Sequence, residues 1–197
     1  MNTLRLARIT VHLGSLLPLL WLSVVIILGG DEFGADPAKE IQHFLGFVAL
    51  TLFIILFGLR LFVSLTQQLK FQILHRPLGL WAFFYLVLHL LSYFWLELGG
   101  ETKLFLQEIS ERGYLLIGLG SLLAFLFTLL AVSPLGNKFG RVSWHLHKVS
   151  YVALVLAGIH YFLSTKGIEL TAIIYNILIA TFLLTLFYLR KTSKKRG

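Results

Sequence analysis

Cysteine is absent from this 197-residue chain, and methionine occurs only as Met1. Without thiols, disulfides, thiolate metal sites and cysteine-ligated iron–sulfur clusters are all excluded. Because Met1 is the one methionine, no methionine is expected to ligate a metal within the membrane. Histidine, at seven positions, is therefore the metal ligand of soft-to-borderline character that the sequence offers.

Motifs that bind nucleotides are lacking as well, since there is no P-loop and no G-x-G-x-x-G. Acidic residues are few, nine against seventeen Lys and Arg, and none lies deep inside an apolar stretch. A proton relay or a cation pathway built on carboxylates is therefore not expected. The net charge of +8 is distributed in a way that indicates a membrane rather than a nucleic acid.

Long apolar runs are abundant, and 57% of the residues are hydrophobic. A helix needs about 20 apolar residues to cross the hydrocarbon core of a bilayer. The sequence predicts an all-α integral membrane protein, a single domain over residues 1–197 folded as a six-transmembrane-helix bundle. A short interfacial helix is expected at 98–113. The six predicted spans are 9–28, 43–63, 77–97, 114–133, 148–164 and 170–189.

The charges assign an orientation to these spans. With the N-terminus inside, thirteen of the seventeen basic residues fall on the inner side and all nine acidic residues fall on the outer side. Because positive residues favour the cytoplasmic side, both termini are predicted to be cytoplasmic.

Two predicted spans carry histidines at matched depths. His75 and His89 are 14 residues apart, close to four helical turns, so they share a face with a rise of about 21 Å between them. On the fifth span, His160 pairs with either His145 or His147. An ideal helix places His145 about 60° and His147 about 140° around the axis from His160, which favours His145.

The third and fifth spans run in the same direction, so one histidine pair lies near each membrane face. Paired imidazoles on facing helices are the arrangement of bis-histidine haem, and two stacked haems would make an electron path across the bilayer. Arg76 and Lys148 lie where inner haem propionates would emerge, although the orientation rule alone explains them equally well. Gly79, Ala157 and Gly158 would let a flat macrocycle approach, although ordinary packing of small residues explains them too.

The other histidines favour simpler roles. His12 and His43 are expected to be structural rather than iron ligands. A non-redox alternative, in which every histidine only bonds between helices of a transporter or structural protein, stays open. The matched depths, and the lack of inverted repeats with broken helices, count against it.

Three stretches, GADPAKEIQHFLG, RPLGLWAFFYLVLHLLSYFWLELG and WHLHKVSYVALVLAGIHYFLS, resemble the MsrQ (YedZ) family, as does LLPLLWL in the first span. The resemblance covers nearly the whole chain. Members are haem b membrane subunits of the bacterial methionine-sulfoxide reductase system, within the ferric-reductase-like transmembrane superfamily. The resemblance implies haem ligation by His89, His147 and His160, which favours His147 over His145. His75 stands where the family often has arginine, and it would complete an inner bis-histidine site, so that two haems are favoured over one.

The resemblance also implies a function. The chain would be an electron-transfer subunit, rather than the catalytic subunit, in the bacterial inner membrane. Electrons would come from quinol or a cytosolic flavin reductase and pass to MsrP, a periplasmic molybdopterin enzyme that reduces oxidised methionines, with FMN as an associated cofactor. The acidic outer segment GGDEFGADPAKE would steer that partner. The alternative is a stand-alone ferric or quinone reductase of the same fold.

Overall fold

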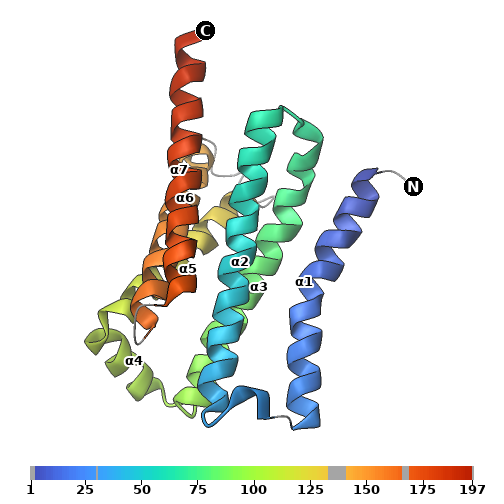
Figure 1. Cartoon of the computed structure of the whole chain (residues 1–197). Coiled ribbons are helices and arrows are strands. Elements are labelled where there is room, and N and C mark those ends of the chain that lie inside the picture. The colour runs from blue at the N-terminus through green and yellow to red at the C-terminus, as the bar shows by residue number, and fades with distance from the viewer. Residues whose placement is uncertain (1–2, 30, 133–140, 166–168, 197) are drawn as a thin grey trace. The chain divides into compact units, whose positions relative to one another are not determined.

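The computed structural model describes residues 3–29, 31–132, 141–165 and 169–196. Within these ranges the chain is helical apart from short connections and contains no strand, which confirms the all-α class. Figure 1 shows the helices. In chain order they are α1 (Thr3–Leu28), the 3-10 helix η1 (Asp31–Phe33), α2 (Pro37–Thr66), the 3-10 helix η2 (Leu69–Leu74), α3 (His75–Ser92), the π-helix η3 (Tyr93–Glu97), α4 (Thr102–Glu111), α5 (Gly113–Val132), α6 (Arg141–Ser164) and α7 (Leu170–Arg196).

Among the described residues, five helical segments are long and apolar enough to cross a membrane. They are Thr3–Leu28, Pro37–Thr66, Leu69–Glu97, Gly113–Leu130 and Leu170–Leu189, and they coincide with the first four predicted spans and the last. The predicted fifth span matches a shorter apolar stretch of α6, Lys148–Ser164. The count of six spans therefore stays a prediction.

Two compact units divide the chain. Unit 1 comprises Met1–Phe53 and Ile73–Glu108, and unit 2 comprises Ile54–Gln72 and Ile109–Gly197. The boundary falls within α2, so this helix contributes its first half to unit 1 and its second half to unit 2.

Unit 1 is built on α1, α3 and the start of α2. The indole Nε1 of Trp81 donates to His12 Nδ1 at 2.9 Å, and the hydroxyl of Tyr85 donates to the Ser15 carbonyl at 2.6 Å. Residue numbers rise together along the two helices, so α1 and α3 run in the same direction. Tyr85 is completely buried, and its hydroxyl needs this bond to α1 because a buried polar group without a partner is costly.

Unit 2 is built on α5, α6 and α7, with the second half of α2. The Ser121 hydroxyl on α5 donates to the Ala153 carbonyl on α6 at 2.8 Å. The Asn176 side chain on α7 donates to the Gly158 carbonyl on α6 at 3.1 Å. These polar ties hold α6 between its two neighbours, which is how polar side chains join helices in a membrane.

The end of α3 changes its winding. The amide of Leu98 donates to the Tyr93 carbonyl, five residues earlier, in the π-helix η3. A tight turn at Gly100, whose φ of +81° favours glycine, then leads into α4. The Tyr93 hydroxyl donates to Glu108 at 3.3 Å, and Phe105 packs against the Tyr93 ring. The short helix expected at 98–113 is thus present as α4.

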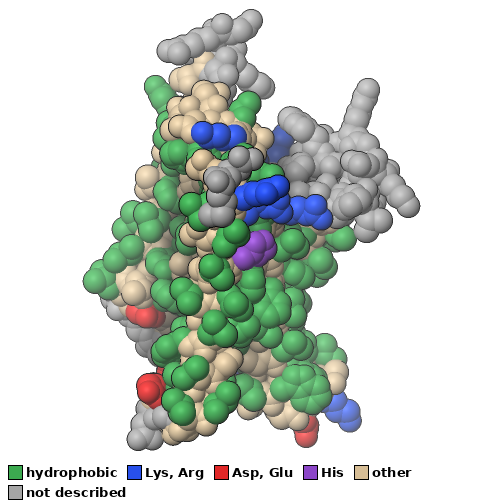
Figure 2. Space-filling view, turned by 90° about the vertical axis from the view of Figure 1, so that its right-hand side faces the viewer, with side chains coloured by type: hydrophobic (Ala, Val, Ile, Leu, Met, Phe, Trp, Pro, Cys, Tyr) green, Lys and Arg blue, Asp and Glu red, His purple; other side chains and the backbone are tan. Residues whose placement is uncertain are grey.

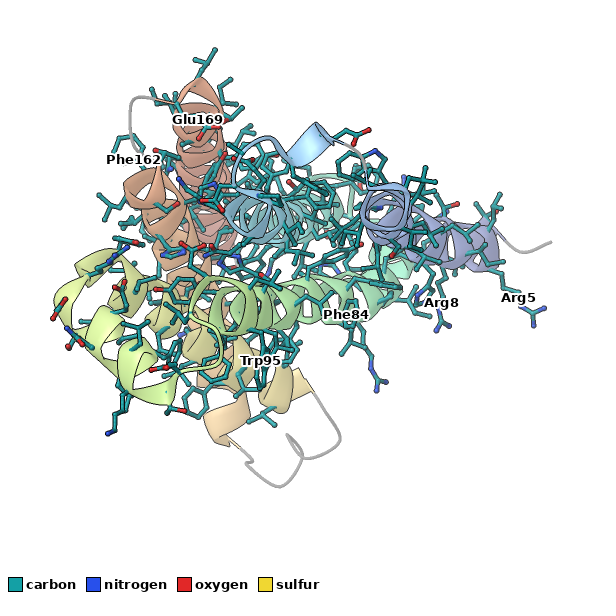
Figure 3. All side chains as sticks on the ribbon, turned by 90° about the horizontal axis from the view of Figure 1, so that it is seen from below. Arg5, Arg8, Phe84, Trp95, Phe162 and Glu169 are labelled. Atoms are coloured by element: carbon teal, nitrogen blue, oxygen red, sulfur yellow. The ribbon has the colours of Figure 1, made fainter. Side chains whose placement is uncertain are left out.

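Apolar side chains dominate the surface. Figure 2 shows many of them on one face, where charged side chains are few. Ile27 and Leu28 are 80% and 76% exposed. Arg5 and Arg8 project outward from the first turns of α1 (Figure 3). Such a surface suits contact with lipid, because the described backbone is hydrogen-bonded within its helices.

Candidate functional site

His89 lies near the end of α3 and faces the start of α2. Its Nδ1 is 2.8 Å from the carbonyl oxygen of Gln42. Because a carbonyl oxygen only accepts hydrogen bonds, Nδ1 carries the hydrogen and donates it. In the neutral ring, Nε2 then keeps a lone pair, which is the electron pair that binds a metal.

Gly46 explains why the His89 ring can approach α2 so closely. A Cβ at this position would lie 2.9 Å from Nδ1 and 3.0 Å from Cε1 of His89. Any other residue would therefore force the ring to move. Gly46 stands four residues after Gln42, so the carbonyl and the open position share one face of α2.

His160 repeats this arrangement on α6, where its ring faces the start of α5. Its Nδ1 is 2.7 Å from the Tyr114 carbonyl oxygen. A Cβ at Gly118 would lie 2.7 Å from Nδ1 and 2.8 Å from Cε1 of His160. The same reasoning gives Nδ1 the hydrogen and leaves the lone pair on Nε2.

We call this arrangement an imidazole cradle: a helix-start carbonyl that accepts from Nδ1, with a glycine four residues later. The first cradle belongs to unit 1, and the second belongs to unit 2. The sequence separations between carbonyl and histidine are almost equal, 47 and 46 residues. The first cradle is Gln42, Gly46 and His89, and the second is Tyr114, Gly118 and His160.

The cradles fit the bis-histidine haem expected from the sequence. An axial imidazole ligates iron through one ring nitrogen, while the other donates to a carbonyl or carboxylate that fixes the tautomer and the ring orientation. Each cradle supplies a carbonyl acceptor for Nδ1 and the space that the ring needs.

The remaining predicted site residues are placed as follows. His75 is the half-buried first residue of α3, so α3 carries His75 and His89 toward its two ends, as their spacing predicted. The neighbouring Arg76 is exposed, and so is Lys148 on α6. His145 and His147 lie within α6, but their side chains are outside the described residues, so the choice between them stays a prediction.

The small residues that were predicted to let a haem macrocycle approach are buried or half-buried in helix packing. Gly158 is buried against α7, where a Cβ would lie 2.8 Å from both Asn176 Oδ1 and Ile179 Cδ1. Its role is therefore ordinary helix packing, and the macrocycle interpretation is wrong at this position. Gly79 is buried within unit 1 and Ala157 is half-buried in unit 2.

The other described histidines also have clear surroundings. His12 accepts a hydrogen bond from Trp81 across two helices, which is the structural role expected for it. His43 is exposed in the second turn of α2, one residue beyond the cradle carbonyl of Gln42.

Sequence reasoning missed the residues that hold the imidazoles. The small residues predicted to matter lie on the helices that carry the histidines, whereas Gly46 and Gly118 lie on the preceding helices. The signal that was available is the repeated spacing, with a glycine at the start of an apolar helix and a histidine 43 or 42 residues later.

Comparison with known proteins first defines the class. Residues 44–158 match the family model described as the ferric reductase like transmembrane component. Taken with the apolar helices, this match defines a multi-pass membrane protein of the ferric-reductase-like class.

Similarity to individual proteins is more specific. A Pasteurella multocida protein named "Protein-methionine-sulfoxide reductase heme-binding subunit MsrQ" is 46% identical over 177 residues, covering 89% of this chain and 86% of that protein. Proteins of the same name from Pectobacterium carotovorum and Yersinia pseudotuberculosis are 40% and 39% identical, covering 93% and 90% of this chain and 92% and 87% of their own lengths. The chain belongs to the MsrQ family.

Proposed function

We propose that this protein is a haem b electron conduit of the cell membrane. The observation that carries the proposal is the pair of imidazole cradles, which place the ring hydrogen on Nδ1 and so make Nε2 the nitrogen through which His89 and His160 would ligate iron. The relatives support it, because their name describes a haem-binding subunit. When bound, haem supplies an iron that alternates between two oxidation states and so carries one electron at a time.

The ligands are assigned from depth in the membrane and from the cradles. His89 and His160 would ligate the iron of a haem near the outer face. His75 and His147 would ligate the iron of a second haem near the inner face, with two haems favoured over one. Arg76 and Lys148 would contact the propionates of the inner haem, where their positive charge eases electron entry by raising its potential.

The topology that we propose follows the charges. Six spans, with both termini in the cytoplasm, place the acidic connections outside and most basic residues inside. Such an orientation corresponds to a bacterial inner membrane, with electrons entering at the basic side and leaving at the acidic side.

The partners follow from the family. The name of the relatives refers to a protein-methionine-sulfoxide reductase, which supports a periplasmic MsrP-like molybdoenzyme as the acceptor. Quinol or a cytosolic flavin reductase would donate the electrons, and FMN would be an additional cofactor. The chain itself would transfer electrons and carry out no substrate chemistry.

An absorbance spectrum of the purified protein, oxidised and dithionite-reduced and with haem quantified per chain, tests the proposal. The wild type should show a sharp reduced α-band and close to two haems. His75→Ala should retain one haem, and His89→Ala should lose the outer one. A wild-type protein without a Soret band would overturn the proposal, while a single haem unaffected by His75→Ala would restrict it to the outer site.

A stand-alone ferric or quinone reductase of the same fold is the second candidate, favoured by the description of the matching family model. Rapid oxidation of the reduced protein by a ferric chelate, without any protein partner, would support this candidate. Oxidation that requires a molybdoenzyme would support the conduit.

A further inference from the structure

The two cradles differ in charge at the position two residues before the carbonyl. Glu40 precedes Gln42 in the first cradle, whereas Arg112 precedes Tyr114 in the second. The Arg112 guanidinium Nη1 donates to the Tyr114 hydroxyl at 3.2 Å. The Arg112 side chain is thus directly linked to a residue that forms the His160 cradle.

Tyr114 contacts His160 in two ways. Its carbonyl oxygen accepts from the imidazole Nδ1, and its ring lies beside the imidazole, with the ring centroids 6.0 Å apart and the planes inclined by 34°. The imidazole of His160 therefore contacts Tyr114, and the phenol hydroxyl of Tyr114 in turn contacts the guanidinium of Arg112.

Arg112 lies at the polar end of this arrangement. It immediately precedes the first residue of α5, and its side chain is exposed. The planar guanidinium of arginine suits carboxylates, because it offers two parallel N–H donors. The Tyr114 hydroxyl accepts from Arg112, so its own hydrogen can be donated elsewhere.

We propose that Arg112 and Tyr114 together bind a propionate carboxylate of the haem that His160 ligates. This inference rests on the proposed function, and it adds two residues to the binding site.

Haem retention tests this inference in the full-length protein. Wild type, Arg112→Gln and Tyr114→Phe are loaded with haem b in detergent, and haem loss to an excess of apomyoglobin is timed. The same proteins, produced without haem, are loaded with haem dimethyl ester, which lacks free carboxylates. Lys103→Gln, which removes one positive charge from α4, is the matched control.

Arg112→Gln should speed the loss of haem b several-fold, up to about tenfold, because the propionate loses a charge-assisted hydrogen bond that solvent partly screens. Tyr114→Phe should have a smaller effect in the same direction. With the dimethyl ester, wild type and Arg112→Gln should lose haem equally fast.

Two results would overturn the inference. One is loss of haem b from Arg112→Gln at the rate of wild type and Lys103→Gln. The other is an equal acceleration with haem b and its dimethyl ester, which would give Arg112 a purely structural role. A wild-type protein that binds no haem would instead overturn the proposed function, so the two failures are distinguishable.

Discussion

The two cradles hold their imidazoles with the same backbone device but receive different support from neighbouring helices. In unit 1, α3 is tied to α1 by the hydroxyl of Tyr85 and the indole of Trp81. In unit 2, α6 is tied to α7 by the amide of Asn176 and to α5 by the hydroxyl of Ser121. The backbone device therefore determines the tautomer and position of each ring, whereas the supporting side chains only hold the helices in place.

This comparison predicts that substitutions of the two cradle glycines will reduce haem binding more than any other change discussed below. Gly118→Ala and Gly46→Ala should displace the imidazole rings, because the added Cβ would lie 2.7 Å and 2.9 Å from Nδ1. Overpacking of this kind costs about 1–3 kcal/mol, and the displaced ring should also bind iron poorly. Haem content and the Soret spectrum of each variant would measure the effect.

Nearby glycines provide the controls for this prediction. Gly120→Ala would meet only Leu156 Cδ1, at an ordinary 3.5 Å, and Gly14→Ala would meet nothing within 4 Å. Full haem content in Gly118→Ala together with an unchanged spectrum would show that the cradle does not determine ring position.

Asn176→Ala should have the next largest effect. The Asn176 amide donates to Gly158 and to Ala172, so the variant loses both bonds and leaves a small cavity beside α6. We expect a loss of stability of about 1–2 kcal/mol, seen as a lower thermal denaturation midpoint in detergent. Thr181→Ala, which loses only a bond within α7, should change the midpoint little. Equal effects of the two variants would contradict a specific tie between α6 and α7.

Tyr85→Phe should reduce the stability of the protein less than Asn176→Ala does, because it removes one hydrogen bond and keeps the buried ring. The expected loss is about 0.6 kcal/mol, the average for such bonds between helices in a membrane. The same denaturation assay measures it, and Tyr188→Phe, at an exposed position of α7, serves as the reference. A loss larger than that of Asn176→Ala would reverse the ranking of the two ties.

The smallest expected effect is on the rate of electron transfer to a partner, and it concerns the acidic residues Asp36 and Glu40 near the first cradle. Asp36→Asn with Glu40→Gln should slow electron transfer to a basic partner protein about two- to threefold at low ionic strength, and much less at high salt, because exposed charges mainly steer encounters. Lys39→Gln, in the same turn, should change the rate in the opposite direction. Stopped-flow reoxidation at two salt concentrations provides the measurement. Salt-independent rates in all variants would exclude this segment as the docking surface.

The sequence predicted most of the helices because apolar length is a local property. It placed the fifth span at 148–164, whereas α6 begins at Arg141, since polar residues such as Arg141 and Ser143 form helix without adding to an apolar run. The α-helical spacing of His75 and His89 was predictable for the same local reason.

The cradles could not be predicted in this way. Which carbonyl accepts from His89 depends on how α2 packs against α3, and a backbone carbonyl carries no signal in the sequence. Gly158 and Gly118 look equivalent as letters, yet one packs against Asn176 and the other against His160. Only the spatial neighbour distinguishes a glycine that packs helices from one that accommodates a ring.

The π-helix η3 has a consequence for how this protein tolerates insertions and deletions. A π-helical turn is an α-helical turn that has absorbed one extra residue. Because η3 begins at Tyr93, four residues after His89, a one-residue deletion within Tyr93–Glu97 would restore α-helical winding without rotating His89 relative to Gln42. The segment that leads into α4 can therefore vary in length across evolution while the ligand and its hydrogen bond keep their register.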